Sequence, residues 1–361
     1  MSRSNNIFSR LKRKLPQHSS KIKLTLLLAG LGLGIFFLYS LVAPLTHLVQ
    51  TLLKGPSAII SFTQDASQNL KTTQGRTNIL LLGMGGEGHE GALLTDSIIV
   101  ISYNHDQKAA TLISLPRDLW VDSLKTKINA VYYYGEQKQA GGGLILAKSA
   151  VAEITDLPIH YGFAINFDGF KEAIDLVGGV DVDIKRTFDD YRYPIPGMEN
   201  AYPEELRYEH LHFDAGLAHL NGELALKYVR SRHAQGEEGT DFARSQRQQQ
   251  VLIAFKDKLI SSKTLLDLPK INQLLGLYQV YIDTDILDTE YASFAKIALN
   301  LKSDKIRSIS LATDDSKTGE IGILEVPQDK QPYQNQWVLI AKDNNWNALK
   351  LYIQNQLNQQ D

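Results

Sequence analysis

The chain contains no cysteine, and this absence excludes a disulfide scaffold among its 361 residues. No spacing resembles a zinc site either, since the histidines are scattered along the sequence. A composition of 43% hydrophobic and 22% charged residues excludes a collagen-like or wholly disordered chain. What remains is a globular protein of one large domain or two, each able to bury a core.

Acidic residues are missing from residues 1–64, although the whole chain is nearly neutral. Its 38 lysines and arginines and its 40 aspartates and glutamates give a formal net charge of -2. Eight of the basic residues lie in residues 1–64. Subtracting them leaves 30 basic against 40 acidic residues, a net charge of -10 for residues 65–361. Such an asymmetry requires a physical reason.

Charged side chains are also absent from residues 24–53. Residues 24–43 are almost wholly apolar, and a helix of that length crosses the roughly 30 Å hydrocarbon core of a bilayer. A soluble helix would have a polar face, which this segment lacks, and no clear small-x-small cleavage site of a signal peptide follows it. We therefore expect an uncleaved membrane anchor. Seven basic residues precede the span and only Lys54 follows closely, which predicts a cytoplasmic N-terminus. Glycines from Gly30 to Gly34 permit homodimerisation through this helix.

The pattern of residues predicts four segments. They are a basic cytoplasmic segment at 1–23, a membrane helix at 24–43, a tether at 44–75 and an extracytoplasmic domain at 76–361. Within the domain, strands are expected at 78–82, 97–103, 109–114, 180–184, 306–311 and 336–341. Helices are expected at 144–154, 167–177, 221–229, 241–260, 291–301 and 346–357. This interleaving predicts an α/β fold with a mixed central sheet between helices. Prolines, tyrosines and acidic residues predict an extended surface insertion over 185–215.

Nucleotide-binding loops are missing as well. The run from Gly83 to Gly88 imitates a dinucleotide-binding turn, but another strand rather than a helix is expected after it. No Gly-Lys-Ser/Thr follows, which excludes a P-loop. The basic head is too short for a folded DNA-binding domain, so we expect no nucleic-acid partner. A topology signal that contacts anionic lipids explains it better.

Arginines, in contrast, gather in one stretch. Residues 65–361 contain ten arginines, and four of them fall within eighteen residues, at Arg230, Arg232, Arg244 and Arg247. Arg244 and Gln248 share a helical face near a helix start that Thr240 or Asp241 would cap. Arginines at that end oppose the helix dipole, and guanidinium forks there suit a multiply charged anion such as phosphate. A solvated face paired with nearby glutamates is the alternative, and spacing alone does not choose between them.

A second polar group follows a strand end, at Ser114-Leu-Pro-Arg117-Asp118. Strand ends in α/β sheets commonly carry sites. Asp96 would lie beside this end if its strand pairs antiparallel with the next one. An Asp–Arg pair is more often structural than catalytic, but an aspartate near several arginines could instead hold Mg²⁺.

These segments together resemble the LytR-CpsA-Psr family of bacterial cell-envelope phosphotransferases. The matching stretches keep the family order over residues 76–259. They are Asn78–Gly83, Leu94–Ile98, Ser114–Asp118, Lys127–Ala130, Ile165–Phe170, Asp175–Asp183, Leu220–Ala225, Tyr228–His233 and Asp241–Gln249. Residues 260–361 form a C-terminal extension without a recognised motif.

The resemblance implies a transferase reaction outside the bacterial cell membrane. A polyprenyl-pyrophosphate-linked glycan would be the donor and a peptidoglycan hydroxyl the acceptor in cell-wall assembly. The lipid tail would occupy an apolar tunnel between sheet and helices, and a single-pass anchor in the lipid bilayer would raise the local donor concentration. A hydrolase of the same pyrophosphate, and a non-catalytic regulator that binds lipid phosphate or wall glycan, are the alternatives.

The resemblance also implies roles for individual residues. Catalytic roles are expected for Arg117, Asp118, Arg230, Arg232, Asp241 and Arg244. Pyrophosphate binding is expected of Arg117, Lys127, Arg230, Arg232, Arg244, Arg247 and Gln248. Asp96 would help to bind Mg²⁺, the expected cofactor. The chain has Gly85 and Leu94 where many members have a metal-site aspartate and an arginine. Glu87, His89 and Glu90 are further candidates for the missing ligand.

Overall fold

The computed structural model of the protein describes residues 66–86, 91–198, 200–314 and 321–359, all within the compact unit Pro56–Asp361. The predicted cytoplasmic segment and the predicted membrane helix at 24–43 lie outside these residues. Among the helices that the structure describes, none has the length and apolar composition needed to cross a bilayer.

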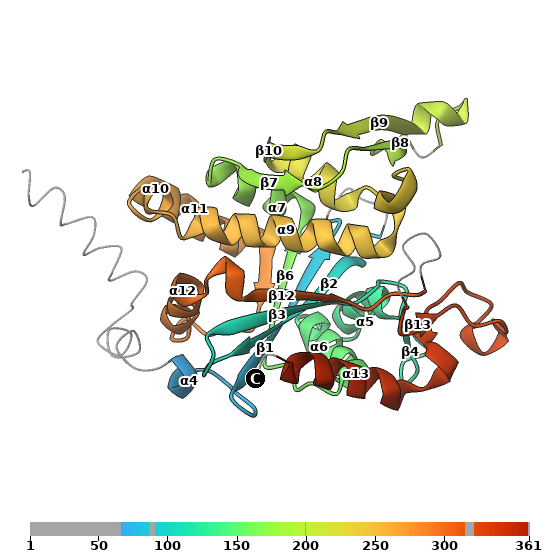
Figure 1. Cartoon of the computed structure of the whole chain (residues 1–361), viewed down its shortest axis with the longest axis horizontal. Coiled ribbons are helices and arrows are strands. Elements are labelled where there is room, and N and C mark those ends of the chain that lie inside the picture. Colours follow the sequence, from blue (N-terminus) through green and yellow to red (C-terminus); the bar gives the residue numbers. More distant parts are fainter. Residues whose placement is uncertain (1–65, 87–90, 199, 315–320, 360–361) are drawn as a thin grey trace, which may run out of the picture. The chain divides into compact units, whose positions relative to one another are not determined.

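A six-stranded mixed sheet lies at the centre of this unit (Figure 1). In spatial order its strands are β11 (Ile282–Thr284), β6 (Tyr161–Asn166), β1 (Arg76–Met84), β2 (Thr95–Asn104), β3 (Ala109–Ser114) and β12 (Ile306–Ser310). The strands β1, β2 and β3 form an antiparallel meander, whereas β6 runs parallel to β1 and β12 runs parallel to β3. The predicted α/β class with a mixed central sheet is therefore confirmed, as is the antiparallel pairing next to Asp96.

One face of the sheet is covered by a tightly packed layer of helices. The layer consists of α5 (Val131–Lys138), α6 (Gly142–Thr155) and α13 (Trp346–Asn358). Successive side chains of a strand point to opposite faces, and in β1 it is Leu80, Leu82 and Met84 that are buried against these helices. Each fully buried aliphatic side chain of this kind contributes roughly 1.5–3 kcal/mol.

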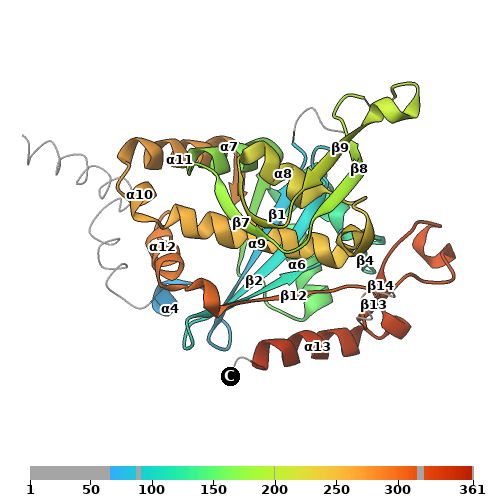
Figure 2. The same cartoon turned by 45° about the horizontal axis from the view of Figure 1, so that its top comes forward.

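The opposite face lies toward α9 (Asp241–Leu259), which crosses the sheet in both views (Figures 1 and 2). On this face Leu81 of β1 is in register with Ile99 of β2 and Phe163 of β6. These three apolar side chains form a row across the central strands. Leu81 and Phe163 keep part of their surface accessible despite their central position. This face is therefore less completely filled than the other.

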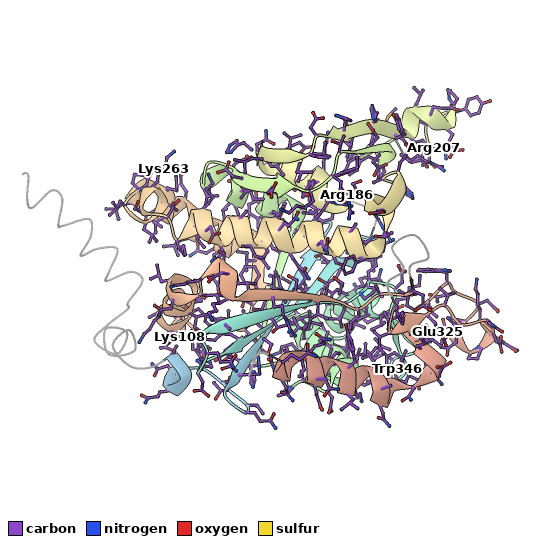
Figure 3. The ribbon with its side chains drawn as sticks, viewed as in Figure 1. Lys108, Arg186, Arg207, Lys263, Glu325 and Trp346 are labelled. Carbon is purple, nitrogen blue, oxygen red and sulfur yellow. The ribbon has the colours of Figure 1, made fainter. Side chains whose placement is uncertain are left out.

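A second core lies above α9 in Figure 1. It is built by α7 (Phe167–Leu176), β7 (Val180–Ile184), β8 (Phe188–Pro194), β9 (Tyr208–Phe213), β10 (Gly216–Leu220) and α8 (Gly222–Arg230). The expected surface insertion over 185–215 needs correction, because Phe188, Tyr193 and Phe213 are buried in this core. The two strands β8 and β9 form a hairpin arm whose end carries Tyr202, which is 90% exposed, and Arg207, labelled in Figure 3.

The C-terminal segment completes the main sheet. Its strands β11 and β12 form the two sheet edges, and its helix α13 enters the first core. The motif boundary at residue 259 is thus not a structural boundary. The segment also contains α10 (Ser262–Leu265), α11 (Leu268–Tyr281), α12 (Tyr291–Asn300), β13 (Leu324–Glu325) and β14 (Ile340–Ala341). Neither α5 nor α11 was predicted, and the strand expected at 336–341 is reduced to β14.

Residues at the end of the predicted tether are already part of the fold. A helical turn, α4 (Ala66–Asn69), precedes β1. Ala66 and Leu70 are buried against the sheet residues Tyr103 and Ala110. The packed domain therefore begins at least ten residues before the predicted boundary at 76.

Candidate active site

The end of the β2–β3 pair brings Arg117 and Asp96 together. The Leu115 N–H donates to the Ile98 carbonyl and extends the ladder past the last residue of β3. Arg117 consequently lies opposite the first residues of β2, and its Nη1 donates to Asp96 Oδ1 in an ion pair. Both side chains are about one-third exposed, at 31% and 34%. A charged group of partial exposure at a strand end is accessible to a ligand.

Asp118 holds the cations of this corner in place. Its Oδ1 accepts from Lys127 Nζ at 2.8 Å, and its Oδ2 lies 3.6 Å from Arg117 Nε. Lys127 belongs to the short strand β5 (Thr126–Lys127), which pairs with β4 (Trp120–Val121). Asp118 is buried, and a buried carboxylate is stable only when it is paired. We therefore assign Asp118 a positioning role toward Arg117 and Lys127.

Arg230, the last residue of α8, is held by aromatic rings. Its guanidinium carbon lies 4.3 Å from the ring centre of Phe167 and 5.8 Å from that of Tyr193. Its Nη1 also donates to the Tyr193 hydroxyl at 3.4 Å. Burial raises the pKa of Tyr193, so this hydroxyl stays neutral at physiological pH. Ring faces attract a guanidinium without using its N–H donors, which leaves the fork suited to an anion.

The turn that carries Arg232 is fixed by a buried aspartate from β8. Asp190 is completely buried, and its Oδ2 accepts from Ser231 Oγ at 2.7 Å and from the backbone N–H groups of Arg232 and His233 at 3.2 Å each. Its Oδ1 accepts from the Arg192 N–H at 2.9 Å. Sequence reasoning missed Asp190, because an aspartate in an acidic, proline-rich stretch gives no signal that it is buried.

Arg247 has a different environment from the other arginines. It is 2% exposed, and its guanidinium donates to the carbonyls of Tyr228, Ser231 and Glu238 at 2.7–3.0 Å. Nη1 also pairs with the Glu238 carboxylate at 2.9 Å, and burial lowers the pKa of Arg247. The sequence grouped this residue with the pyrophosphate-binding arginines. Its donors instead connect α9 to the end of α8, which is a structural role.

The start of α9 places Arg244 and Gln248. Of the two predicted caps, Thr240 or Asp241, it is Thr240 that caps the helix, since its Oγ1 accepts from the Ala243 N–H at 3.1 Å. Arg244 is buried and Gln248 is partly buried one turn later. Asp241 is the first residue of this helix, and its side chain lies outside the described part of the structure.

Two connections place these groups at one end of the main sheet. Gln249 Nε2 of α9 donates to Ser114 Oγ at 2.9 Å, which joins the helix of Arg244 to the strand that leads to Arg117. Met84 at the end of β1 is in register with Asn166 of β6 and with Thr95 of β2. Asn166 precedes Phe167, the ring under Arg230, and Thr95 precedes Asp96. The sheet thus relates two arginine groups: Arg117 beside Asp96, and the group of Arg230, Arg232 and Arg244. The sequence alone did not show that the elements carrying these two groups are connected.

Of the expected metal ligands, Asp96 lies among the described residues, whereas Glu87 and Glu90 lie outside them. Within the described part of the chain, three acidic or histidine side chains with closely spaced ligand atoms occur together on the β8–β9 hairpin and not at Asp96. Asp96 could contribute one carboxylate oxygen to a cation whose other ligands come from substrate and water.

Comparisons with known proteins agree with this architecture. The chain is 32% identical over 251 residues to the polyisoprenyl-teichoic acid–peptidoglycan teichoic acid transferase TagV of Bacillus subtilis, covering 67% of this chain but only 58% of TagV. It is 30% identical over 300 residues to the enzyme named TagU from Oceanobacillus iheyensis, covering 82% of this chain and 86% of TagU. The crystal structure of B. subtilis TagV matches with a TM-score of 0.54 and 27% identity, over 80% of this chain and 99% of that one.

The family assignment rests on a match to the family as a whole. The sequence pattern of the LytR_cpsA_psr family matches residues 49–337, which include every described strand of the main sheet and both arginine groups. The order of motifs, the mixed sheet, the two curated relatives and the solved structure of TagV all agree. This protein belongs to the LytR_cpsA_psr family.

Proposed function

We propose that this protein transfers a glycopolymer from a polyprenyl-pyrophosphate carrier to a peptidoglycan hydroxyl. The proposal is supported by two contacts: Gln249, on the helix that carries Arg244, donates to Ser114, three residues before Arg117, and Arg230 packs on Phe167, which directly follows β6. Family membership and the transferase names of TagV and TagU support it. The acceptor and donor follow from those names, which describe teichoic acid, a polyisoprenyl carrier and peptidoglycan.

The pyrophosphate is the part of the donor that the arginines recognise. A pyrophosphate diester carries two negative charges, and guanidinium forks bind phosphate oxygens through paired N–H donors. Arg230 is oriented by Phe167 and Tyr193, and the turn of Arg232 is held by Asp190. Because these supports are buried, the cations are positioned before the donor arrives, which lowers the entropy lost on binding.

The proposed cofactor is Mg²⁺, with Asp96 as its protein ligand. Mg²⁺ is commonly bound by one or two carboxylates together with substrate phosphates and water. The ion pair with Arg117 engages Asp96 Oδ1, and the carboxylate has a second oxygen. When bound, the ion would neutralise charge on the pyrophosphate oxygens. Glu87 and Glu90 remain candidates for a further ligand.

The less filled face of the sheet is the proposed site of the polyprenyl chain. Leu81 and Phe163 retain accessible surface in the central strands, below α9. An apolar chain would remove this surface from water, at roughly 25 cal/mol per Å². The row formed by Leu81, Ile99 and Phe163 crosses β2 three residues from Asp96, so a tail bound along the strands from there would bring its pyrophosphate toward Asp96 and Arg117.

The transfer itself is a displacement at phosphorus. The acceptor hydroxyl forms a new bond to the phosphorus that carries the glycan, and the bridging phosphorus–oxygen bond breaks. Polyprenyl phosphate leaves with the electron pair of that bond, and the hydroxyl proton passes to a base. Our candidate for this base is Asp241 at the start of α9. Such a reaction depends mainly on positioning and charge neutralisation, which the arginines provide.

The proposed location is the bacterial cell membrane. The apolar segment at 24–43 would anchor the chain once, with the N-terminus in the cytoplasm and residues 76–361 outside. A tether holds the domain near lipid-linked donors and raises their effective concentration.

The test is a transfer assay with the full-length protein in detergent. A polyprenyl-pyrophosphate-linked teichoic acid, peptidoglycan and Mg²⁺ should yield peptidoglycan-bound glycan and polyprenyl phosphate. Arg230→Ala should lower the rate about a hundredfold, as expected when one donor to the reacting oxygens is lost. Arg186→Ala is the matched control, because Arg186 is an exposed arginine paired with Glu237 and Glu238 (Figure 3).

The other outcomes assign a different function. Release of phospho-glycan without peptidoglycan would identify a hydrolase. Donor binding without turnover would identify a non-catalytic binder. Full transfer by Arg230→Ala would contradict the assigned site.

A further inference from the structure

The β8–β9 hairpin carries a cluster of side chains that the proposed transfer does not use. His210 and His212 lie on one face of β9, and Asp189 of β8 is in register with His212. His210 Nε2 and His212 Nδ1 lie 2.7 Å and 2.8 Å from the same oxygen, Asp189 Oδ1. One ligand atom from each residue falls within 4.8 Å of the others.

We propose that Asp189, His210 and His212 bind a divalent transition-metal ion, Zn²⁺ in the first instance. Two imidazole nitrogens and one carboxylate are a set that Zn²⁺ accepts and that Mg²⁺ and Ca²⁺ disfavour. Ligand bonds of 2.0–2.2 Å in a tetrahedron separate the ligand atoms by roughly 3.3 Å. The observed separations of 2.7 and 2.8 Å from Asp189 Oδ1 need to open by about half an ångström, which surface rotamers allow.

Asp214 supplies the support that metal-bound histidines generally have. His212 Nε2 lies 3.2 Å from Asp214 Oδ1, so a proton on Nε2 can be donated to this carboxylate. That tautomer leaves Nδ1, which faces Asp189, free of a proton and able to bind the metal. The three ligand side chains are 29–47% exposed, so an ion can enter from solvent and water can complete its coordination.

The position of the cluster gives the ion a structural consequence. Asp189 is followed by Asp190, the buried carboxylate that holds the turn of Arg232. The Asp189 carbonyl also accepts from the Gln235 N–H at 2.9 Å, just beyond that turn. A metal that joins β8 to β9 at this point would fix the base of the arm on which the turn rests. The site is distinct from the Mg²⁺ proposed at Asp96.

Sequence spacing did not reveal the cluster. Two histidines separated by one residue are common on exposed strands, and Asp189 lies 21 residues before His210. The hairpin register is what brings the three together.

The experiment is a Zn²⁺ titration of the full-length chain, carrying a histidine-free affinity tag and treated beforehand with chelator. A competing chromophoric chelator reports bound metal, and we expect one Zn²⁺ per chain. His210→Ala/His212→Ala and Asp189→Asn should abolish this binding, and Asp214→Asn should weaken it 10–100-fold. His219→Ala is the matched control, because His219 is an exposed histidine that contacts an aspartate, Asp181, on the neighbouring strand pair.

Equal binding by the double variant, or equal loss in His219→Ala, would overturn the proposal. So would a Co²⁺-loaded wild-type chain with the weak absorption of an octahedral aquo ion instead of the strong visible bands of a tetrahedral site. Both measurements are made without donor or peptidoglycan. A failed transfer assay therefore leaves this inference untouched, and a failed titration leaves the proposed transfer untouched.

Discussion

At the scale of single residues, the arginines divide by what surrounds them. Arg230 lies against two aromatic rings, and of its donors Nη1 contacts the Tyr193 hydroxyl at 3.4 Å. Arg247 donates to three carbonyls and a carboxylate inside the protein. The same residue type thus lies on aromatic faces in one place and binds buried carbonyls in the other, although the two lie only seventeen positions apart.

This division predicts opposite results for two lysine substitutions. Arg247→Lys keeps the charge but loses the planar fork, so several buried carbonyls lose their donor, and we expect about 3 kcal/mol of destabilisation. Arg230→Lys should change stability by less than about 1 kcal/mol but slow transfer at least tenfold. Urea unfolding and the transfer assay measure the two effects. Unchanged stability in Arg247→Lys would remove the structural role assigned to this residue.

At the scale of elements, the start of β6 depends on an uncharged histidine. His160 Nδ1 accepts from the Asn78 N–H at 2.9 Å, and Nε2 lies 3.0 Å from Thr73 Oγ1. Burial, and after it the nearby Lys71 and Lys148, lower the pKa of His160. A protonated ring would lose the acceptor that joins β6 to β1.

The lowered pKa fixes the sign of a pH effect. The unfolded chain takes up a proton near pH 6.5, whereas the folded chain does so at lower pH. Stability supplied by neutral His160 is therefore complete above about pH 6.5 and falls as the solution is acidified toward the folded pKa. In His160→Asn, whose Oδ1 can accept from Asn78 without titrating, the difference in unfolding free energy between pH 7.5 and 5.5 should shrink. An equal difference in wild type and variant would argue against this role.

Local elements were predictable and contacts between distant elements were not. The apolar spacing that predicted α7, α8, α9 and α13 depends on a few neighbouring residues. Helical spacing placed Arg244 and Arg247 at the start of one helix, but did not say that Arg247 faces the interior. Asp190 reaches Ser231 across 41 residues, and no local pattern reports such a contact. The hairpin strands β8 and β9 were missed for a related reason, since prolines and tyrosines there resemble a surface loop.

At the scale of the whole described unit, the C-terminal helix shares a core with the sheet. Leu349 and Ile353 of α13 are fully buried among residues of β1, β2 and α6. A segment without a recognised motif is therefore required for the fold that carries the site.

A single substitution tests this sharing. Ile353→Ala should lower the unfolding free energy by about 2–5 kcal/mol. Unfolding can be followed by circular dichroism of the whole fold and by fluorescence of the tryptophans, which include Trp346 at the start of α13 (Figure 3). The unfolding transitions that the two probes report should shift together. Leu351→Ala is the control on the same helix, because Leu351 is 57% exposed. A shift in fluorescence alone would mean that α13 unfolds separately.

The edge strand β12 has a consequence for how the protein is made. Ile306 of β12 pairs with Ala110 of β3. The edge of β3 that faces away from β2 therefore has no strand to pair with until most of the chain has been synthesised. During that interval the open edge of β3 can pair with another chain. Contacts this distant in sequence also slow folding, because a long loop must close before they form. We therefore expect expression yield to depend more strongly on residues 306–310 than their small contribution to the candidate site would imply.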